Sequence, residues 1–496
     1  MSAFSDVLNR FKEEKNIKIQ PLARYCEIER STIYKFINGK RLPGNISVVK
    51  KIAQFMQLTP SETHTLTNAW KVSHIGSEAY FSQKSVEDFI CQFPDKPTDP
   101  MPALDSSISL PEIPSDNTFV VLSSQQYVNN CVRQMILNET GKTSGKIGLF
   151  LQPDYSFLFQ LLASLNPSGT LQIDHIFSLP GHIAFNSHHQ LYNLEYLKEI
   201  FPIYANGLDY NTLYFYNSTK ASVYSPSIMP CLILTSDAAV MCTADHQNGL
   251  YYQDKKTLQM LWRIFEKNKE QCQPLFKPIL ISPENYLSVF HSIDDAKDDS
   301  NKKIIGIQPE ACLTPFITGA LLRDAFNQEL PQANIMIPMI EEIFLKNRER
   351  VKNGNFLIYF TEAGIKHFAK TGLIEEFPDS FYHPLTPEQR LILLEEIKSC
   401  CQHDYYRLLK GPLQYLPANL HLCVRDTDCE LTYNTSNGKN IFLIICESQF
   451  FQIFKDYLEQ MEETNYYPPE DACALIQNVI NTLKESDQNE SPQLTV

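Results

Sequence analysis

The sequence predicts a multidomain protein, in which a small all-α bundle at the N-terminus precedes a large α/β body built on a mixed sheet. Two observations predict this division of the 496 residues. Residues 1–73 carry 12 Lys and Arg against 6 Asp and Glu, whereas the whole chain has a net charge of −14, which leaves −20 for the rest. Residues 94–116 contain six prolines, a density that forbids helix and interrupts strand pairing. We therefore predict a basic head, a proline-rich linker at 94–116 and an acidic body.

Five short helices are predicted in the head from the spacing of its apolar residues. They cover residues 4–16, 21–24, 30–38, 46–56 and 60–70. Asn38 and Gly39 end the third helix, because both tolerate the left-handed conformation used just beyond a helix end. Thr59 and Glu62 have the spacing of a capping box, which predicts the start of the fifth helix. A further helix at 74–93 is expected to connect the head to the linker.

The second and third helices are separated by a short turn and followed by a basic segment, which is the order of a helix-turn-helix motif. The stretch PLARYCEIERSTIYKFINGKRLP has Leu-Ala in the first of these helices, Ser-Thr at the start of the second and Gly-Lys-x-x-Pro behind it. With these residues it resembles the Cro/repressor-type (XRE) helix-turn-helix family. The resemblance covers about 70 residues and implies a sequence-specific DNA-binding transcriptional regulator that contacts a double-stranded operator.

The resemblance also implies which residues read bases. The base-reading positions of the family fall on Arg30, Ser31 and Lys35, with Thr32 and Tyr34 on the flanks of the same surface. Arg and Lys can donate to guanine, and Ser or Thr can serve several bases.

Further positions are assigned from the same pattern. Phosphate contacts, which position the protein without reading sequence, are expected from Asn38, Lys40 and Arg41. Core packing is expected from Ile33, Phe36 and Ile37. Two residues depart from the family pattern in the first helix of the motif: Pro21 replaces a frequent Glu, and Ile19 replaces a polar residue that commonly faces phosphate.

The basic residues could instead form the solvated face of an ordinary bundle, or the helix pair could bind protein. The order of landmarks and the local charge favour DNA. One such domain neutralises few phosphates and binds weakly, so a homodimer is expected. The apolar residues within 78–93 are one candidate for the dimer contact, and packing on the head's own bundle is the alternative.

Beyond the linker, short apolar runs typical of strands alternate with segments whose apolar residues have helical spacing. This order predicts an α/β fold with a mixed sheet. Residues 117–300 and 301–480 both end in three strands followed by a helix, so a duplicated α/β unit is a hypothesis. The polar residues 481–496 are predicted to form a disordered tail.

Two α/β halves in this order are similar to the phospholipase D superfamily, in which each half donates a His-x-Lys motif for phosphodiester chemistry. The sequence contains no His-x-Lys and none of the common phosphate-loop, dinucleotide, serine-hydrolase or zinc-protease motifs. We therefore predict a body that is not an enzyme, with no catalytic residues, no metal site and no cofactor. The alternatives are a DNA-associated phosphodiesterase or nuclease-like enzyme, and an interaction module of an autoregulated defence or toxin-control system.

The last predictions concern the location of the protein, the state of its cysteines and the role of the body. No apolar run approaches the ~20 residues that cross a bilayer, and the N-terminus has no apolar core of a signal peptide, so a cytoplasmic protein is expected. The 13 cysteines include no C-x-x-C pair, which is typical of reduced structural thiols. The body is then expected to assemble the protein and to bind an unidentified small-molecule or peptide effector.

Overall fold

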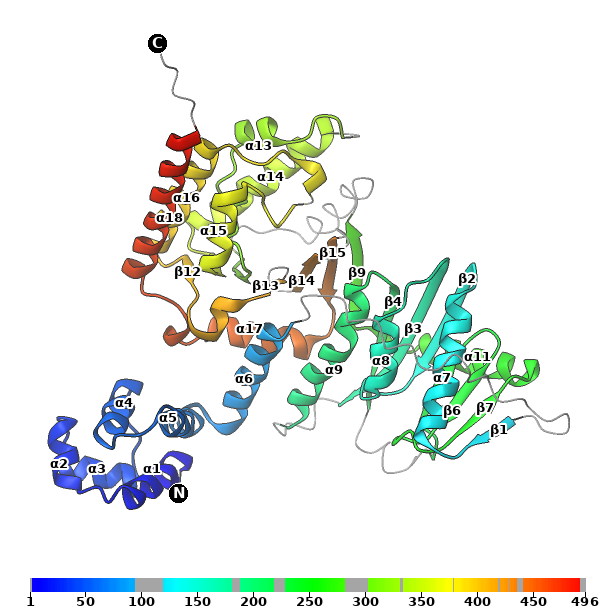
Figure 1. The fold of residues 1–496 in the computed structure, drawn as a ribbon, viewed down its shortest axis with the longest axis horizontal. Coiled ribbons are helices and arrows are strands. Elements are labelled where there is room, and N and C mark those ends of the chain that lie inside the picture. Colours follow the sequence, from blue (N-terminus) through cyan, green and yellow to red (C-terminus); the bar gives the residue numbers. More distant parts are fainter. Residues whose placement is uncertain are drawn as a thin grey trace, which may run out of the picture. The chain divides into compact units, whose positions relative to one another are not determined.

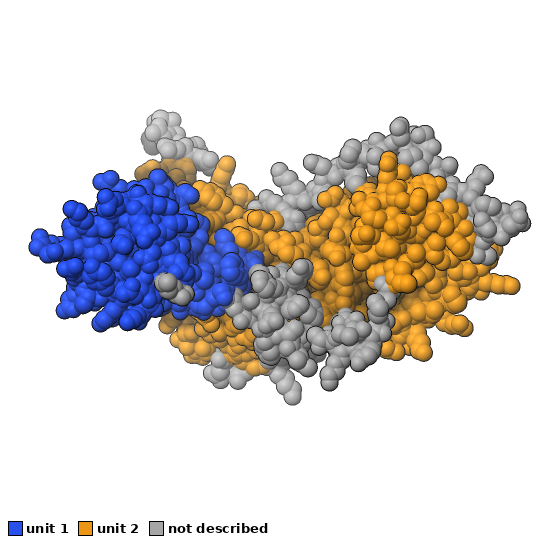
Figure 2. Space-filling model, turned by 90° about the horizontal axis from the view of Figure 1, so that it is seen from below, with its two compact units in different colours: residues 1–85, 185–192 blue, residues 86–184, 193–496 orange. Residues whose placement is uncertain are grey.

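A computed structural model describes the protein at residues 2–93, 119–180, 188–217, 228–281, 302–330, 333–377, 379–417, 420–426, 428–434 and 440–490. The chain forms two compact units, coloured separately in Figure 2. Unit 1 contains residues 1–85 and 185–192, and unit 2 contains residues 86–184 and 193–496. The predicted linker at 94–116 lies outside the described residues.

Unit 1 contains the helical bundle predicted for the head (Figure 1). Its helices are α1 (Ala3–Glu14), α2 (Ile19–Tyr25), α3 (Arg30–Ile37), α4 (Ile46–Phe55), α5 (Pro60–Ile75) and the first part of α6 (Ser77–Cys91). Local sequence fixes where they begin, because the side chains of Ser2 and Asn45 accept hydrogen bonds from backbone N–H groups in the first turns of α1 and α4. The capping box predicted at Thr59 and Glu62 is present at the start of α5. One apolar cluster fills the centre of this bundle.

Unit 2 contains two mixed sheets, with strand orders β1-β7-β6-β5-β2-β3-β4-β8 and β12-β11-β10-β13-β14-β15-β9 (Figure 1). The first has β1 (Phe119–Leu122), β2 (Ser144–Phe150), β3 (Thr170–Pro180), β4 (Asp209–Asn217), β5 (Cys231–Leu234), β6 (Ala239–Cys242), β7 (Gly249–Tyr252) and β8 (Gln273–Pro274). The second has β9 (Phe276–Ile281), β10 (Ile304–Ile307), β11 (Phe356–Phe360), β12 (Tyr406–Leu408), β13 (Leu420–Arg425), β14 (Cys429–Asn434) and β15 (Asn440–Ile445). The helices between and after these strands are α7 (Gln125–Thr140), α8 (Ser156–Ala163), α9 (His188–Ala205), α11 (Lys255–Lys269), α13 (Gly319–Ala325), α14 (Ala333–Lys352), α15 (Glu362–Thr371), α16 (Pro387–Gln402), α17 (Ser448–Glu459) and α18 (Pro469–Glu490).

The two sheets repeat one topology. In the first, β2, β3 and β4 run parallel, β5, β6 and β7 form an antiparallel meander beside β2, and β7 pairs with β1. In the second, β10, β11 and β12 run parallel, β13, β14 and β15 form the same meander beside β10, and β15 pairs with β9. Each strand from β1 to β7 thus has a counterpart from β9 to β15 in the same chain order. The hypothesis of a duplicated α/β unit is confirmed at the level of topology.

A short sequence repeat accompanies the repeated topology. Gln152-Pro153-Asp154 follows β2, and Gln308-Pro309-Glu310 follows β10. Both segments lie at the carboxyl edge of the parallel strands, where open α/β sheets bind their ligands. Because β2 and β10 hold equivalent places in their sheets, the two segments occupy equivalent positions.

The two halves of unit 2 share apolar packing. The largest apolar cluster contains residues of both sheets, among them Leu149 of β2 and Ile305 of β10. The ring of Phe201 in α9 packs edge-on against that of Phe276 in β9, with centroids 5.7 Å apart. Because separating the halves would expose this surface to water, they are stabilised as one unit.

The structure places α6 differently from the helix predicted at 74–93. Gly76, with a φ of +91°, separates α6 from α5. The C-terminal part of α6 belongs to unit 2, where the ring of Phe89 packs against the rings of Phe201 and Phe454. At Val86, Phe89 and Ile90 the predicted alternatives, a dimer contact or packing on the head's own bundle, are therefore wrong, because these side chains are buried in the core of the body. Residues 78–85 of the predicted segment belong to unit 1.

Two predicted boundaries in the body are also wrong. β9, at Phe276–Ile281, pairs along its whole length with β15, so the second sheet begins well before residue 301. α18 continues to Glu490, through most of the tail predicted to be disordered from residue 481, and its Leu483 is buried. Residues 491–496 lie outside the described part of the chain.

Candidate nucleic-acid interface

The inner face of α3 holds this helix against the rest of the bundle. Ile33, Phe36 and Ile37 are buried, as predicted. The turn before α3 is tight, because Glu27 has a φ of 57° and the N–H of Ile28 donates to the carbonyl of Ala23 at 3.0 Å. This left-handed residue just beyond the end of α2 reverses the chain within a few residues. The opposite face of α3 is left to solvent.

The predicted base-reading side chains lie on α3, mostly on this outer face. Arg30, Ser31, Tyr34 and Lys35 are exposed, and Thr32 is partly buried. The guanidinium of Arg30 donates to the hydroxyl of Tyr34 at 3.3 Å and lies 5.5 Å from the centre of its ring. The hydroxyl of Ser31 donates to the carboxylate of Glu29 at 3.1 Å. The contact with Tyr34 therefore restricts the conformations of the Arg30 side chain on the outer face of α3.

The end of α3 fixes the segment that carries the predicted phosphate contacts. The N–H groups of Lys40 and Arg41 donate to the carbonyl of Lys35 at 2.9 and 3.2 Å. Gly39 has a φ of +68°, and a β-carbon at this position would lie 3.1 Å from Oγ of Ser5 in α1, so this turn requires glycine. The side chains of Asn38, Lys40 and Arg41 are all exposed beyond this turn.

The two departures from the family pattern have a structural explanation. α2 begins at Ile19 rather than at Pro21. Ile19 is buried, so it is a packing residue of the bundle. Pro21 lies in the first turn of α2, where its missing N–H group breaks no intrahelical hydrogen bond. Neither side chain offers a donor to a phosphate.

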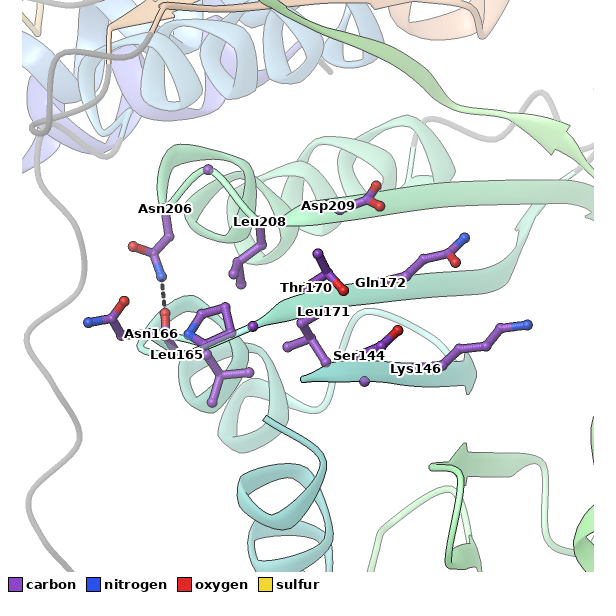
Figure 3. Close-up of a pocket in the computed structure, with 14 residues that line it drawn as sticks. Ser144, Lys146, Leu165, Asn166, Thr170, Leu171, Gln172, Asn206, Leu208 and Asp209 are labelled. Carbon is purple, nitrogen blue, oxygen red and sulfur yellow. Dashed lines mark hydrogen bonds between the residues drawn. The ribbon is translucent and has the colours of Figure 1, made fainter. Parts of the chain in front are cut away.

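The amino ends of the parallel strands β2, β3 and β4 form a groove of about 660 Å³ (Figure 3). Its wall includes Lys146, Asn166 and Asp209, and the side-chain amide of Asn206 donates to the carbonyl of Leu165 at 2.6 Å. Ligands of open α/β sheets bind at the opposite, carboxyl edge of the strands. The groove therefore lacks the position typical of a ligand site, and the carboxyl edges are the better candidates.

The carboxyl edge of the second half gathers buried acidic groups that the sequence analysis missed. The carboxylate of Glu310, after β10, accepts a hydrogen bond from the N–H of Glu375 at 2.9 Å, and its other oxygen has no hydrogen-bond partner among the described residues. Burial, followed by the charges of Glu375 and Glu376, raises the pKa of Glu310 well above its ordinary value. Nε2 of His421 in β13 lies 3.7 Å from the carboxylate of Glu375. Glu310 therefore keeps its proton to a higher pH than an exposed glutamate.

The carboxyl edge of the first half gathers two thiols and an imidazole, which were also missed. Cys231, Cys242 and His246 are buried, and their ligand atoms all lie within 4.8 Å of one another. A hydrogen bond with Cys242, and a further one with His246, lower the pKa of Cys231 against the opposing effect of burial. The sequence signal is weak, because the three residues come from two strands and a loop and form no C-x-x-C pair.

Comparison with known proteins identifies the class of the N-terminal domain. Residues 7–65 match the model of the Cro/C1-type HTH DNA-binding domain. The N-terminal part of the chain is therefore a DNA-binding domain of this type, as the resemblance in its sequence implied. A search of curated proteins found no match to the chain.

Solved structures give only distant likenesses. Phosphatidylserine synthase from Haemophilus influenzae Rd KW20 is 11% identical, with 83% of this chain and 99% of that chain covered and a TM-score of 0.25. TrmBL2, an archaeal chromatin protein, is 8% identical, with 50% and 84% covered and a TM-score of 0.21. Polyphosphate kinase from Porphyromonas gingivalis is 9% identical, with 74% and 55% covered and a TM-score of 0.21. These scores are too low to support a conclusion about fold or activity.

Within the described parts of the chain, every helix is too short or too polar to cross a membrane.

Proposed function

We propose that the protein is a sequence-specific transcriptional regulator, in which the Cro/C1-type domain reads double-stranded DNA and the body assembles the protein and responds to an effector. The observation that carries this proposal is the exposed outer face of α3, with Arg30, Tyr34 and Lys35, in a domain of this type. In the major groove, Arg30 and Lys35 would donate to guanine, and Ser31, Thr32 and Tyr34 would contact neighbouring base edges. This activity would be exercised on the genome, in the cytoplasm.

The end of α3 would hold the domain in register on the duplex. Asn38, Lys40 and Arg41 are exposed on the segment that Gly39 and the hydrogen bonds to Lys35 fix in place. Donors placed this way would contact phosphates on either side of the bases that α3 reads. Such contacts add affinity that does not depend on sequence and that falls with salt.

We propose that the protein acts as a homodimer. One domain of this size neutralises only a few phosphates, so a single copy would bind weakly at physiological salt. Two copies would place two α3 helices about 34 Å apart on one face of the duplex, and the operator would have two related half-sites. The negative charge of the body would repel DNA and confine contact to the head.

We propose that the body is a non-catalytic module. Its sequence has no His-x-Lys motif in either half, and this motif supplies the chemistry of the superfamily that its two-half arrangement resembles. The dimer could adopt two arrangements. An effector that binds at a carboxyl edge more tightly in one arrangement than in the other would shift the population towards that arrangement.

Selection of bound duplexes from a random pool with the full chain tests the DNA-reading role. We expect a defined site with two half-sites, and we expect Arg30→Ala and Lys35→Ala to reduce its preference over random duplex. Arg10→Ala is the matched control, since Arg10 is an exposed cation on α1. Recovery of random sequence, or equal loss of preference in the control, would contradict the proposal. A monomer on a single half-site, seen by sedimentation with bound DNA, would contradict the dimer alone.

Incubation of the full chain with labelled phosphodiesters and divalent metals tests the non-catalytic role. We expect no turnover above a sample without protein. Turnover that Glu310→Gln or His421→Ala removes would assign the body a phosphodiesterase activity and overturn this part of the proposal.

A further inference from the structure

Three potential metal ligands converge at the carboxyl edge of the first sheet. Sγ of Cys231, Sγ of Cys242 and a ring nitrogen of His246 all lie within 4.8 Å of one another. The exposed fractions of the three residues are 5%, 0% and 6%. Thiolate and imidazole are the ligands that zinc prefers in proteins.

The pairing of β5 with β6 brings the two thiols together. Cys231 is the first residue of β5, Cys242 is the last residue of β6, and the two are directly opposite each other in the antiparallel register. Side chains of opposite residues project from the same face of a sheet. Both thiols therefore point to one side of the sheet at its edge.

The loop between β6 and β7 brings the histidine inward. His246 has a φ of 56°, a left-handed conformation that is uncommon for a residue with a side chain. The loop is fixed around it, because the N–H of Thr243 donates to the carbonyl of Asn248 at 2.9 Å and the N–H of Gln247 donates to the carboxylate of Asp245 at 3.1 Å. The left-handed turn at His246 directs the imidazole inward, where it is buried.

The imidazole is also oriented by its neighbours. The ring of Tyr155, next to the Gln152-Pro153-Asp154 segment, stacks on the ring of His246 with centroids 3.8 Å apart and planes inclined by 8°. This stacking leaves the edge of the imidazole facing the thiols, with Nε2 at 3.8 Å from Sγ of Cys231. The histidine therefore presents a nitrogen to the two sulfurs rather than a ring face.

The spacing suits a tetrahedral ion. Bond lengths of about 2.3 Å to sulfur and about 2.0 Å to nitrogen place a sulfur and a nitrogen of one tetrahedral zinc about 3.5 Å apart. The observed separation of 3.8 Å between Cys231 and His246 needs a shift of only a fraction of an ångström. We propose that Cys231, Cys242 and His246 bind Zn²⁺.

A disulfide between the opposite cysteines is the competing interpretation. The 13 cysteines are free in the structure. A disulfide would not require a buried imidazole held in a left-handed loop beside it, whereas a metal ion would use all three groups. The geometry therefore favours the ion, and the competing interpretation becomes an outcome of the test.

The test uses the full chain, stripped of metal by a chelator and kept in a reducing buffer. Co²⁺, a spectroscopic substitute for Zn²⁺, should produce a thiolate-to-cobalt charge-transfer band and the strong visible bands of tetrahedral cobalt, which Zn²⁺ should abolish with one equivalent per chain. Cys231→Ser, Cys242→Ala and His246→Gln should each weaken Co²⁺ binding at least tenfold. Cys272→Ser, a partly buried cysteine of the same half, should bind as the parent does.

A second measurement keeps the proposal testable if a variant is poorly folded. Zn²⁺ should raise the midpoint of thermal unfolding of the parent and of Cys272→Ser, and His246→Gln should lose this shift while retaining the unfolding transition. Octahedral cobalt spectra, spectra unchanged in His246→Gln, or a Cys231–Cys242 disulfide persisting in the reducing buffer would overturn the proposal. None of these measurements uses DNA, so the metal site and the DNA-reading role fail or succeed separately.

Discussion

Replacing Lys40 and Arg41 together by alanine should weaken DNA binding to all sequences alike and flatten its dependence on salt. Both side chains are exposed just beyond α3, on a segment that their own backbone hydrogen bonds to Lys35 hold in place. Each phosphate contact releases condensed counterions and contributes about 0.9 to the slope of log affinity against log salt concentration. Two lost contacts in each of two domains should therefore reduce the slope by about 3.6.

The size of the effect follows from the same relation. Between 50 and 200 mM salt each contact accounts for about a 3.5-fold loss of affinity, so the four contacts of a dimer account for about 150-fold. The affinity of the parent protein should then fall about 150-fold more steeply over this range than that of the double variant. The ranking of different DNA sequences should stay unchanged, because phosphates carry no sequence information.

Fluorescence anisotropy of a labelled duplex, titrated at several salt concentrations, measures both slopes. The matched control is Arg10→Ala with Lys12→Ala, which removes two positive charges from α1 instead. We expect the control to keep a slope close to that of the parent, and circular dichroism should show that both double variants retain the helical fold. Equal slopes of log affinity against log salt concentration for the parent and for the variant lacking Lys40 and Arg41 would refute the assignment of phosphate contacts to this segment.

Three further predictions follow from single positions. Lys35→Ala should reduce discrimination against substituted base pairs by about 1–3 kcal/mol at one operator position while lowering the salt slope little, which competition with substituted duplexes measures. His175 is buried, its Nδ1 lies 2.7 Å from the hydroxyl of Tyr210 and its Nε2 lies 3.0 Å from the carbonyl of Leu151, and burial lowers its pKa to about 4 from 6.5. The unfolded chain takes up a proton first, so stability should be full above pH 6.5 and fall by up to about 3 kcal/mol as the pH drops towards 4. Urea denaturation across this range should show that His175→Gln loses this component, and an unchanged pH slope would contradict it. For Glu310 the pKa is raised in the folded state, so stability should decline as the pH rises above 4.5. Glu310→Gln should therefore be increasingly stabilising towards alkaline pH, and a constant difference from the parent would count against the raised pKa.

The repeated topology bears on what the body resembles. The two sheets of the body repeat one arrangement of strands, as expected for a duplicated α/β unit. Each half also carries a Gln-Pro-acid segment at the carboxyl edge of its first parallel strand. The polar groups at the two edges differ, however, since Cys231 and His246 stand at one and Glu310 and His421 at the other.

The head was largely predictable because its information is local. The capping box at Thr59 and the turn at Gly39 each depend on a few neighbouring residues. The apolar spacing that predicts the burial of Ile33 and Phe36 lies within one helix. The reliance on local signals also explains why α2 was predicted to begin at Pro21 instead of Ile19. Pro21 is a strong local signal, and the burial of Ile19 that extends the helix depends on the rest of the bundle.

The body was less predictable because its short strands depend on their partners. β7 has four residues and β12 has three, which is too short for an alternating pattern to stand out. β9 was missed beside the predicted boundary, although it pairs with six residues of β15. Such strands are stabilised by a ladder of hydrogen bonds to chain segments far away in the sequence.

By itself, the sequence determined the division into a basic head and an acidic body, the class of the head and the side chains of its exposed helix. Charge, helix caps and helical spacing act over a few residues, so no distant contact was needed to recognise them. The tertiary structure alone decided that α6 packs into the body, that the two sheets share one topology and that Cys231, Cys242 and His246 meet. Strand pairing determines the shared topology and brings Cys231 opposite Cys242, whereas ring packing on α9 and α17 buries the C-terminal part of α6. These contacts join residues that are far apart along the chain, so no local pattern indicates them.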